Sequence, residues 1–192
     1  MSDGDASWFG LDPRRSPSQR GDWENVGRLN DLNMADFISV VNREHQLGLN
    51  KHSSILEVGL GEGRLFKRLI AEGYDVTGVE SRKRKEHTAG LPVAHIRIEE
   101  MPFGQDRGTF EIVIAASVFD SRVYKQDPRL MISRIAEALS PGGIFISTSF
   151  PLLSDDFSAV GLERLYLPTP YDGNVRVYRK VRSEASIRNP TS

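Results

Sequence analysis

Three alternating glycines follow a short apolar run and stand directly before a helical pattern. Residues 55–63 read ILEVGLGEG. Glycine lets the backbone turn tightly and approach a ligand without a Cβ in the way. In an open α/β sheet, ligands bind beyond the carboxyl ends of the strands, where this loop would lie. The segment is therefore predicted to contact a ligand through its backbone.

The spacing and charge of this loop limit which ligand it binds. A dinucleotide fingerprint reads G-x-G-x-x-G, with the pyrophosphate at the helix N-terminus. Here the glycines read G-x-G-x-G, and Glu57 stands two residues before Gly59. A carboxylate there would repel a pyrophosphate but attract a cationic amino group. A phosphate-binding loop would need Lys and Ser/Thr after the glycines, where this chain has Arg64 and Leu65.

The elements that position the loop alternate between strands and helices. Strands are predicted over residues 55–58, 75–79, 92–98, 110–116 and 144–148, with helices from Asn33, over 64–72 and from Pro128. Such alternation implies right-handed crossovers and a parallel sheet covered on both faces. The alternating segments 162–167 and 175–181 predict a final antiparallel pair. The predicted fold is α/β, a Rossmann-like three-layer sandwich whose mostly parallel seven-stranded sheet ends in an antiparallel C-terminal hairpin.

The glycine segment resembles the first motif, E/D-x-G-x-G-x-G, of the class I S-adenosylmethionine-dependent methyltransferases. Four further segments resemble that family in order, and they read GVE at 78–80, IEEMPF at 98–103, FEIV at 110–113 and LSPGG at 139–143. The resemblance extends over roughly residues 33 to 182. It implies methyl transfer with S-adenosylmethionine as the cofactor.

The resemblance also implies a cofactor site. Glu80 would bind both ribose hydroxyls, since an ionised carboxylate has about four lone-pair sites. The backbone near Ile98 would read the adenine edge. Many members place an Asp for the adenine amino group where this chain has Arg97, which offers no acceptor. The predicted cofactor residues are Glu57, Gly59, Leu60, Gly61, Gly63, Glu80, Ser81, Ile98, Glu99, Ala115 and Ala116.

No side chain is singled out as catalytic, because methyl transfer from a sulfonium requires mainly that the acceptor be held in line and water removed. The [DN]-P-P-[YFW] motif of members that methylate planar amino groups is missing from residues 115–118, which read AASV. Asp120 stands without the clustered carboxylates of a metal site, so no metal is expected. Candidate substrate contacts are Trp23, Asp120, Ser121 and Tyr124.

Composition limits the setting in which the chain works. The chain has no cysteine, which excludes disulfides and thiol catalysis. Its net charge of −1 gives no general attraction to nucleic acid, so no nucleic acid partner is expected. The basic run at 82–85 is interpreted as a solvated helix face. No signal peptide or membrane span is recognised, so a cytoplasmic protein acting on a small molecule is expected.

Residues 1–22 are predicted to form a flexible arm or a lid, 23–182 the methyltransferase domain and 183–192 a tail. Two other functions stay open. A methyltransferase-like binding protein without activity is compatible with Arg97 and with the short segment between the fifth strand and the hairpin. An NAD-dependent oxidoreductase is less favoured by the glycine spacing.

Overall fold

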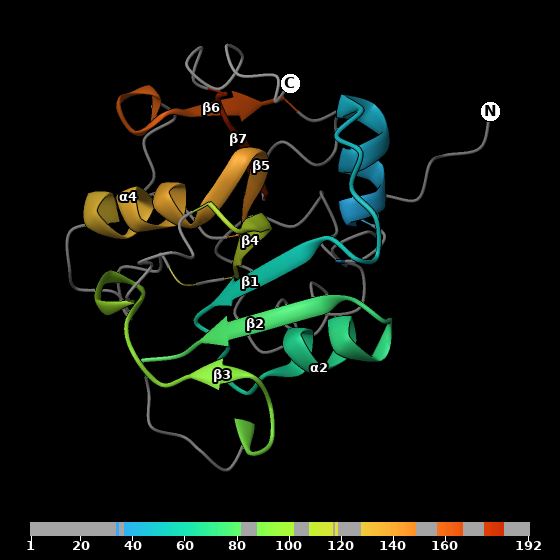
Figure 1. The fold of residues 1–192 in the computed structure, drawn as a ribbon, viewed down its shortest axis with the longest axis vertical. Helices are drawn as coiled ribbons and strands as arrows, with labels where there is room; N and C mark the ends of the chain where they lie inside the picture. Colours follow the sequence, from blue (N-terminus) through green and yellow to red (C-terminus); the bar gives the residue numbers. More distant parts are fainter. Residues whose placement is uncertain are drawn as a thin grey trace, which may run out of the picture.

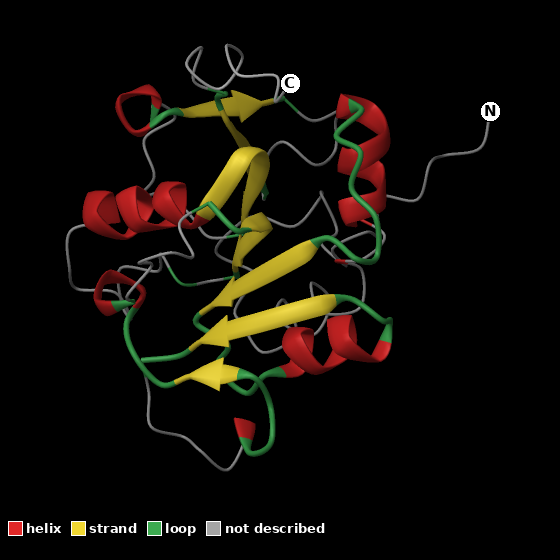
Figure 2. Ribbon diagram, viewed as in Figure 1, coloured by secondary structure: helices red, strands yellow, loops and turns green. Residues whose placement is uncertain are grey.

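A computed structural model of the chain describes residues 34, 37–81, 88–101, 108–116, 118, 128–148, 157–166 and 175–182. They form one seven-stranded sheet with helices on both faces (Figures 1 and 2). The strands are β1 (Ser54–Val58), β2 (Asp75–Val79), β3 (Val93–Ala94), β4 (Phe110–Ala115), β5 (Leu139–Ser147), β6 (Leu162–Leu165) and β7 (Arg176–Lys180). The helices are one over residues 37–45, α2 (Arg64–Ala71) and α4 (Pro128–Ala138), with 3-10 turns η3 (Ile98–Glu100) and η5 (Ser158–Val160).

The sheet has the strand order β3-β2-β1-β4-β5-β7-β6. The first five strands run parallel, and β7 runs antiparallel to both β5 and β6. The predicted sheet and its C-terminal hairpin are therefore confirmed. The order of the chain reverses between β1 and β4, so a topological switch point lies at the carboxyl end of β1, where the glycine loop begins.

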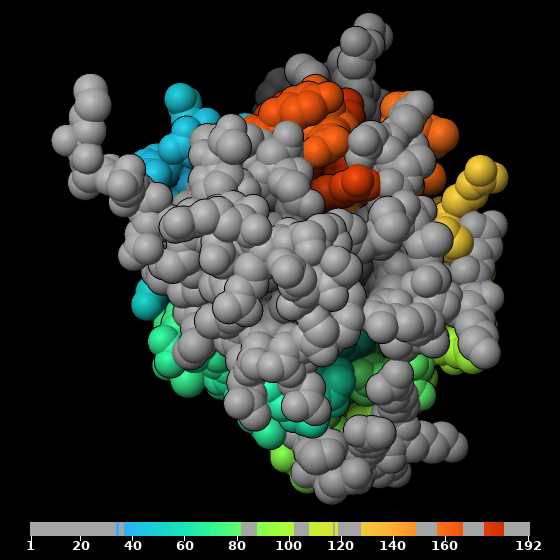
Figure 3. All heavy atoms as spheres, turned by 180° about the vertical axis from the view of Figure 1, so that it is seen from behind, coloured from blue at the N-terminus to red at the C-terminus, as the bar shows by residue number. Residues whose placement is uncertain are grey.

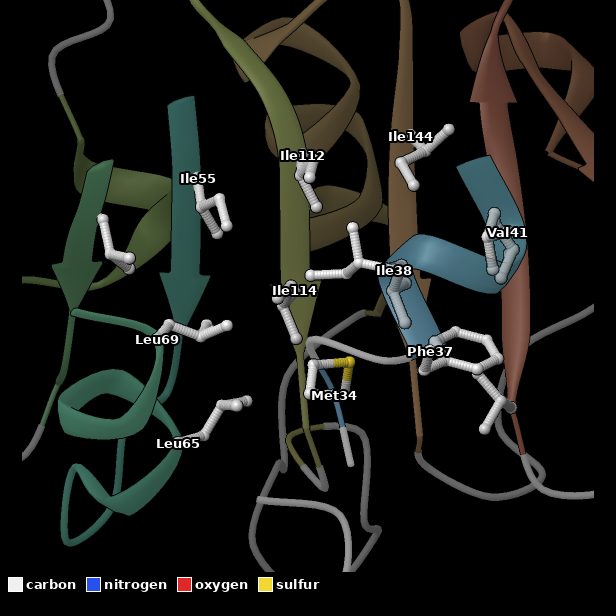
Figure 4. Packing of buried hydrophobic residues seen from close by; sticks show 14 of the residues in the cluster. Met34, Phe37, Ile38, Val41, Ile55, Leu65, Leu69, Ile112, Ile114 and Ile144 are labelled. Carbon is white, nitrogen blue, oxygen red and sulfur yellow. The ribbon is translucent and has the colours of Figure 1, made fainter. Parts of the chain in front are cut away.

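Two apolar layers separate the sheet from its helices. On one face the helix over 37–45 and α2 pack against β1, β4, β5 and β7 (Figure 4). On the other face α4, η3 and η5 cover the sheet around Phe145 and Tyr178, whose rings stack at 5.8 Å. Seen from behind, the helix over 37–45 (blue) and the β6–β7 hairpin (orange and red) lie toward the same end of the molecule (Figure 3).

The amino ends of β1 and β4 are joined by side chains. The Ser54 hydroxyl donates to the Thr109 carbonyl at 2.7 Å, and the Ser54 N–H donates to the Glu111 carboxylate at 3.1 Å. The Glu111 N–H in turn donates to the Ser54 hydroxyl at 3.3 Å. These bonds fix the two central strands relative to each other at the edge opposite the glycine loop.

Two strands differ from their predicted bounds. β3 is only two residues long, because its pairing with β2 ends at Ala94 and the chain then turns toward η3. β5 begins at Leu139, so the predicted sharp turn at 140–143 lies inside the strand. The register changes from Phe110↔Leu139 to Ile112↔Ile144, which makes this segment a bulge.

Two apolar residues of the helices are exposed. Ile70 in α2 is 36% exposed and Leu130 in α4 is 51% exposed. In α2 the buried positions are Leu65, Phe66 and Leu69. Asn33, from which the first helix was predicted to begin, lies outside the described residues. No helix in the described part of the chain is long and apolar enough to cross a membrane.

Candidate cofactor-binding site

The glycine loop is a chain of tight turns between β1 and α2. Gly59, Gly61 and Gly63 have φ angles of 74°, 57° and 68°, a backbone region that residues with a Cβ rarely adopt. The Gly59 N–H donates to the Val79 carbonyl and the Gly63 N–H to the Leu60 carbonyl, both at 2.8 Å. A Cβ on Gly61 would meet no atom within 4 Å. The alternating glycines are thus required by the backbone, and the middle one borders open space.

Leu60 anchors this loop to the protein interior. Its side chain is 6% exposed and lies in the core with Phe66. A Cβ on Gly78 would come within 2.9 Å of both Leu60 and Phe66, so the missing side chain in β2 makes a notch for them. Leu60, predicted as a cofactor residue, therefore directs its side chain into the core and can meet a ligand only through its backbone.

Glu80 directly follows β2 and is 5% exposed. Its Oε2 accepts the Gly61 N–H at 2.7 Å, and its own N–H donates to the Ala94 carbonyl at 3.0 Å. The carboxylate therefore lies against the middle of the glycine loop, between β1 and β3. A carboxylate oxygen that accepts one N–H keeps a lone pair, so the group can still accept hydroxyl donors. Ser81, the next residue, is exposed.

Glu57 is the most deeply buried carboxylate among the predicted residues, at 2% exposure. It pairs in register with Gly78 on one side and with Ile114 on the other. Its side chain lies on the same face of the sheet as Ile55, by the alternation of a strand. Glu57 is the last but one residue of β1, so its negative charge lies close to the switch point, where it would attract a cationic group.

The carboxyl end of β4 borders the same loop. Ala115 is fully buried and Ala116 is partly buried. Val118 lies directly over the first glycine, because a Cβ on Gly59 would stand 2.6 Å from the Val118 Cγ2. The sequence analysis missed Val118, since no spacing rule says which residue after β4 folds back onto the loop. Gly59 is thus required both by its φ angle and by the side chain above it.

The segment predicted to read adenine forms η3 on the α4 side of the sheet. Ile98 is 2% exposed in the core beside Val79, while Glu99 is partly buried. Arg97 is exposed, and its N–H donates to the Glu100 carboxylate at 3.4 Å. Arg134 of α4 donates to the Glu99 carbonyl through Nε at 3.2 Å and Nη2 at 3.0 Å. Sequence reasoning gave no role to Arg134, because its distance from η3 along the chain hides this contact.

Two polar residues at the carboxyl edge were also missed or misplaced. His95 was expected inside a strand, yet β3 ends at Ala94, so His95 lies just past the carboxyl end. Its Nε2 is 3.1 Å from the hydroxyl oxygen of Thr88, which is 3% exposed. Thr148 follows β5, is 9% exposed, and its hydroxyl has no hydrogen-bond partner within the described residues. The positions of His95 and Thr148 at the carboxyl ends of the strands could be recognised only once the ends of β3 and β5 were known.

The predicted substrate contacts Trp23, Asp120, Ser121 and Tyr124 lie outside the described residues and stay predictions. Among the described residues, no group of three or more acidic, His or Cys side chains is arranged to hold a metal ion. The glycine loop, Glu57, Glu80 and the end of β4 are brought together at the switch point, as the sequence analysis expected of them. Ile98 and Glu99 lie on the face of the sheet that α4 covers, where η3 packs against α4.

A strand order of 3-2-1-4-5-7-6, a glycine loop after the first strand and a carboxylate after the second define the class I, Rossmann-like fold of S-adenosylmethionine-dependent methyltransferases. The family model of the methyltransferase domain matches residues 32–185, and the chain belongs to this family. The predicted family and fold are confirmed, and the predicted cofactor agrees with both.

Solved structures share this fold. DesVI of Streptomyces venezuelae has a TM-score of 0.58 and 16% identity, covering 82% of this chain and 93% of DesVI. CalS10 of Micromonospora echinaspora, an amino pentose methyltransferase solved with bound S-adenosylmethionine, has a TM-score of 0.55 and 14% identity, covering 77% of this chain and 91% of CalS10. At these identities the likeness is one of fold.

Among curated relatives, the ubiquinone biosynthesis O-methyltransferase of Coxiella burnetii is 26% identical over 137 residues. The match covers 66% of this chain and 56% of that protein. The chain therefore spans little more than half the length of the curated relatives it matches.

Proposed function

We propose that this domain binds S-adenosylmethionine at the switch point and transfers its methyl group to a small-molecule acceptor. The observation that carries the proposal is the contact between Glu80 and the Gly61 N–H at 2.7 Å, beside the open space at Gly61. A buried carboxylate held against an exposed glycine backbone, beside one open space, suits a ligand with a vicinal diol and an extended chain. Membership of the methyltransferase domain family supports this assignment.

Different residues at the switch point would bind different parts of the cofactor. Glu80 would accept the ribose hydroxyls, and the backbone of the glycine loop would lie along the methionyl chain. The buried carboxylate of Glu57 would compensate the amino group, since an opposite charge favours both ionised forms. Ile98 and Glu99 would border the adenine. When bound, the cofactor supplies a methyl carbon already activated by a sulfonium leaving group.

The protein's own part in the reaction is to place the acceptor and exclude water, which contributes to rate by fixing the reacting geometry. β4 ends at the same side of the sheet as the glycine loop, and Asp120, Ser121 and Tyr124 follow β4 in the sequence. We propose that these three residues and Trp23 contact the acceptor. No catalytic base is assigned, because an acceptor that is already a nucleophile needs none.

A small-molecule acceptor is supported by the relatives. The Coxiella burnetii protein is named for ubiquinone biosynthesis, and CalS10 for an amino pentose. The net charge of −1 gives no general attraction to nucleic acids. The lack of cysteine is compatible with the cytoplasm, which we propose as the site of action.

We propose a domain over residues 23–182 with a flexible N-terminal arm, residues 1–22, and a C-terminal tail, residues 183–192; the alternative for the arm is a lid over the substrate site. Met34 lies beyond Ile114 in the direction of the carboxyl ends of the strands (Figure 4). Met34, the first residue that the structure describes, therefore lies toward the side of the sheet that carries the site. Deleting residues 1–22 should preserve cofactor affinity in either case, and it should lower turnover if the arm is a lid, because a lid excludes water from the reacting atoms. Unchanged turnover would refute the lid.

Calorimetry with S-adenosylhomocysteine tests the proposed function directly. We expect binding to the purified chain and none to NAD at the same concentration. Absence of binding at millimolar S-adenosylhomocysteine would refute the proposal, and binding of NAD in its place would indicate an oxidoreductase. Binding without label transfer from radioactive S-adenosylmethionine to any component of a cell extract would indicate the inactive, ligand-binding alternative.

A further inference from the structure

An arginine of α4 holds the backbone of η3. Two arms of the Arg134 guanidinium, Nε and Nη2, donate to the Glu99 carbonyl at 3.2 and 3.0 Å. The third nitrogen, Nη1, donates to the Glu137 carboxylate at 2.7 Å. The Arg134 and Glu137 side chains are only 27% and 32% exposed, so this arrangement is partly shielded from water. Glu137 fixes the plane of the guanidinium, and the guanidinium fixes the Glu99 carbonyl.

η3 is a segment whose position depends on such contacts from elsewhere. It is a single 3-10 turn of three residues, whose own bonds are the Glu100 N–H to the Arg97 carbonyl and the Met101 N–H to the Ile98 carbonyl. A 3-10 turn has poorer hydrogen-bond geometry than an α-helix. β3 ends four residues before η3, so sheet pairing does not extend to it. Ile98 is anchored in the core, and Arg134 holds the residue that follows.

We infer that Arg134 is a positioning residue for the adenine end of the cofactor site. A peptide unit is planar, so holding the Glu99 carbonyl also fixes the N–H that follows it and limits rotation of the backbone at Glu99. That backbone and the one at Ile98 are the groups proposed to border the adenine. Arg134 acts through them and touches no reacting atom. The inference rests on the proposed function, because it requires an adenine at this site.

A lysine cannot replace this arginine fully. The guanidinium presents its N–H groups in a rigid plane, so it bonds the Glu99 carbonyl twice and the Glu137 carboxylate at once. A lysine ammonium is a point charge on a flexible stem and would reach only one of the two with good geometry. Arg134→Lys should therefore give an intermediate result between the parent protein and Arg134→Met.

The test compares two ligands, S-adenosylhomocysteine and S-inosylhomocysteine, in which a carbonyl replaces the purine amino group. We expect Arg134→Met to weaken S-adenosylhomocysteine binding about tenfold, or ~1.4 kcal/mol. We also expect the preference for the adenine ligand to fall, because a loosened η3 no longer distinguishes the two bases. Arg134→Lys should restore part of that preference. Arg179→Met is the matched control, since Arg179 pairs with an exposed Glu163 at 3.2 Å on the distant hairpin.

Calorimetry gives both affinities, and circular dichroism with thermal unfolding checks the fold of each variant. If Arg134 merely stabilised the domain, the variants would lose affinity for both ligands by the same factor, and the inference would be overturned. Unchanged affinity for both would overturn it as well. If Arg134→Met fails to fold, Arg134→Lys decides between the same outcomes. Failure of the proposed function is distinguishable, because the unaltered protein would then bind neither ligand, which would overturn both ideas.

Discussion

Replacing Glu80 separates the two tasks that the structure gives this carboxylate. Its Oε2 accepts the Gly61 N–H at 2.7 Å, and the proposed function adds the two ribose hydroxyls. Glu80→Gln keeps one acceptor oxygen, which can still serve Gly61, but removes the charge. Hydrogen bonds to charged groups contribute about 1.5–3 kcal/mol. Since ~1.4 kcal/mol is a factor of ten, S-adenosylhomocysteine binding should weaken about tenfold to a hundredfold.

Glu80→Ala should have a second effect. Without any acceptor, the Gly61 N–H loses its partner beside the site, so the free energy of unfolding should fall by about 1–3 kcal/mol. Glu80→Gln should leave it nearly unchanged. Urea unfolding measures the free energy of unfolding, and calorimetry measures the affinity for S-adenosylhomocysteine. Glu163→Gln is the control, because it removes an exposed ion pair of small expected worth.

A cofactor analogue without ribose hydroxyls provides the refutation. Dideoxy S-adenosylhomocysteine should bind the parent protein weakly and lose little more with Glu80→Gln, because both changes remove the same contact. In a double-mutant cycle this appears as a large interaction energy. If the two losses simply added, Glu80 would not bind the ribose, and the placement of the cofactor across β1 and β2 would be wrong.

Three further changes test other parts of the structure. Gly61→Val should abolish S-adenosylhomocysteine binding, because its side chain would enter the open space, and should also lower the free energy of unfolding by about 1–2 kcal/mol, because a Cβ is strained at a φ of 57°; loss of the whole circular dichroism spectrum would instead make this glycine purely structural. Gly143→Ala should lower the free energy of urea unfolding by about 1–3 kcal/mol, since its Cβ would stand 3.0 Å from two backbone oxygens; an unchanged midpoint would contradict the bulge geometry. Lys180 donates to the Ala136 and Leu139 carbonyls at 2.6 Å each, so Lys180→Met should cost about 1 kcal/mol. Burial lowers the pKa of Lys180 below its ordinary value of 10.5, and the negative charge of Glu137 opposes this shift only in part. Between the pKa of Lys180 in the folded protein and its pKa in the unfolded chain, the unfolded chain therefore binds more protons. Stability should therefore rise with pH through that interval in the parent protein, and this rise should be missing from the variant.

Much of the fold was predictable because its signals are local. Consecutive residues are enough to recognise the apolar run of β1, the three glycines and the helix that follows. The same holds for β2, for β4 and for the alternating C-terminal pair. The bulge in β5 was not predictable, because Ser140 and Gly143 read as a turn until pairing with β4 requires them inside the strand.

The site was predictable where it depends on strand ends and not where it depends on contacts across the fold. Gly61 and Glu80 were assigned from sequence, and the structure brings them to hydrogen-bond distance. Arg134 and Val118 act on η3 and on Gly59 through packing that no motif encodes. Leu60 was predicted to bind the cofactor, but its side chain lies in the core. A sequence motif predicts where the backbone of a residue lies, but packing determines where its side chain points.

The notch that Gly78 makes for Leu60 has a thermodynamic consequence for the loop. A glycine-rich segment has much conformational entropy to lose when it is ordered. Here Leu60 is buried against Phe66, so the loop is already ordered when the domain folds. A ligand then meets a preorganised backbone and bears little of that entropic cost on binding. A side chain at residue 78 would fill the notch and displace Leu60, so the loop would no longer be ordered by folding. The entropic cost of ordering the loop would then arise on binding, and the affinity for the ligand would fall although the groups that contact it are unchanged.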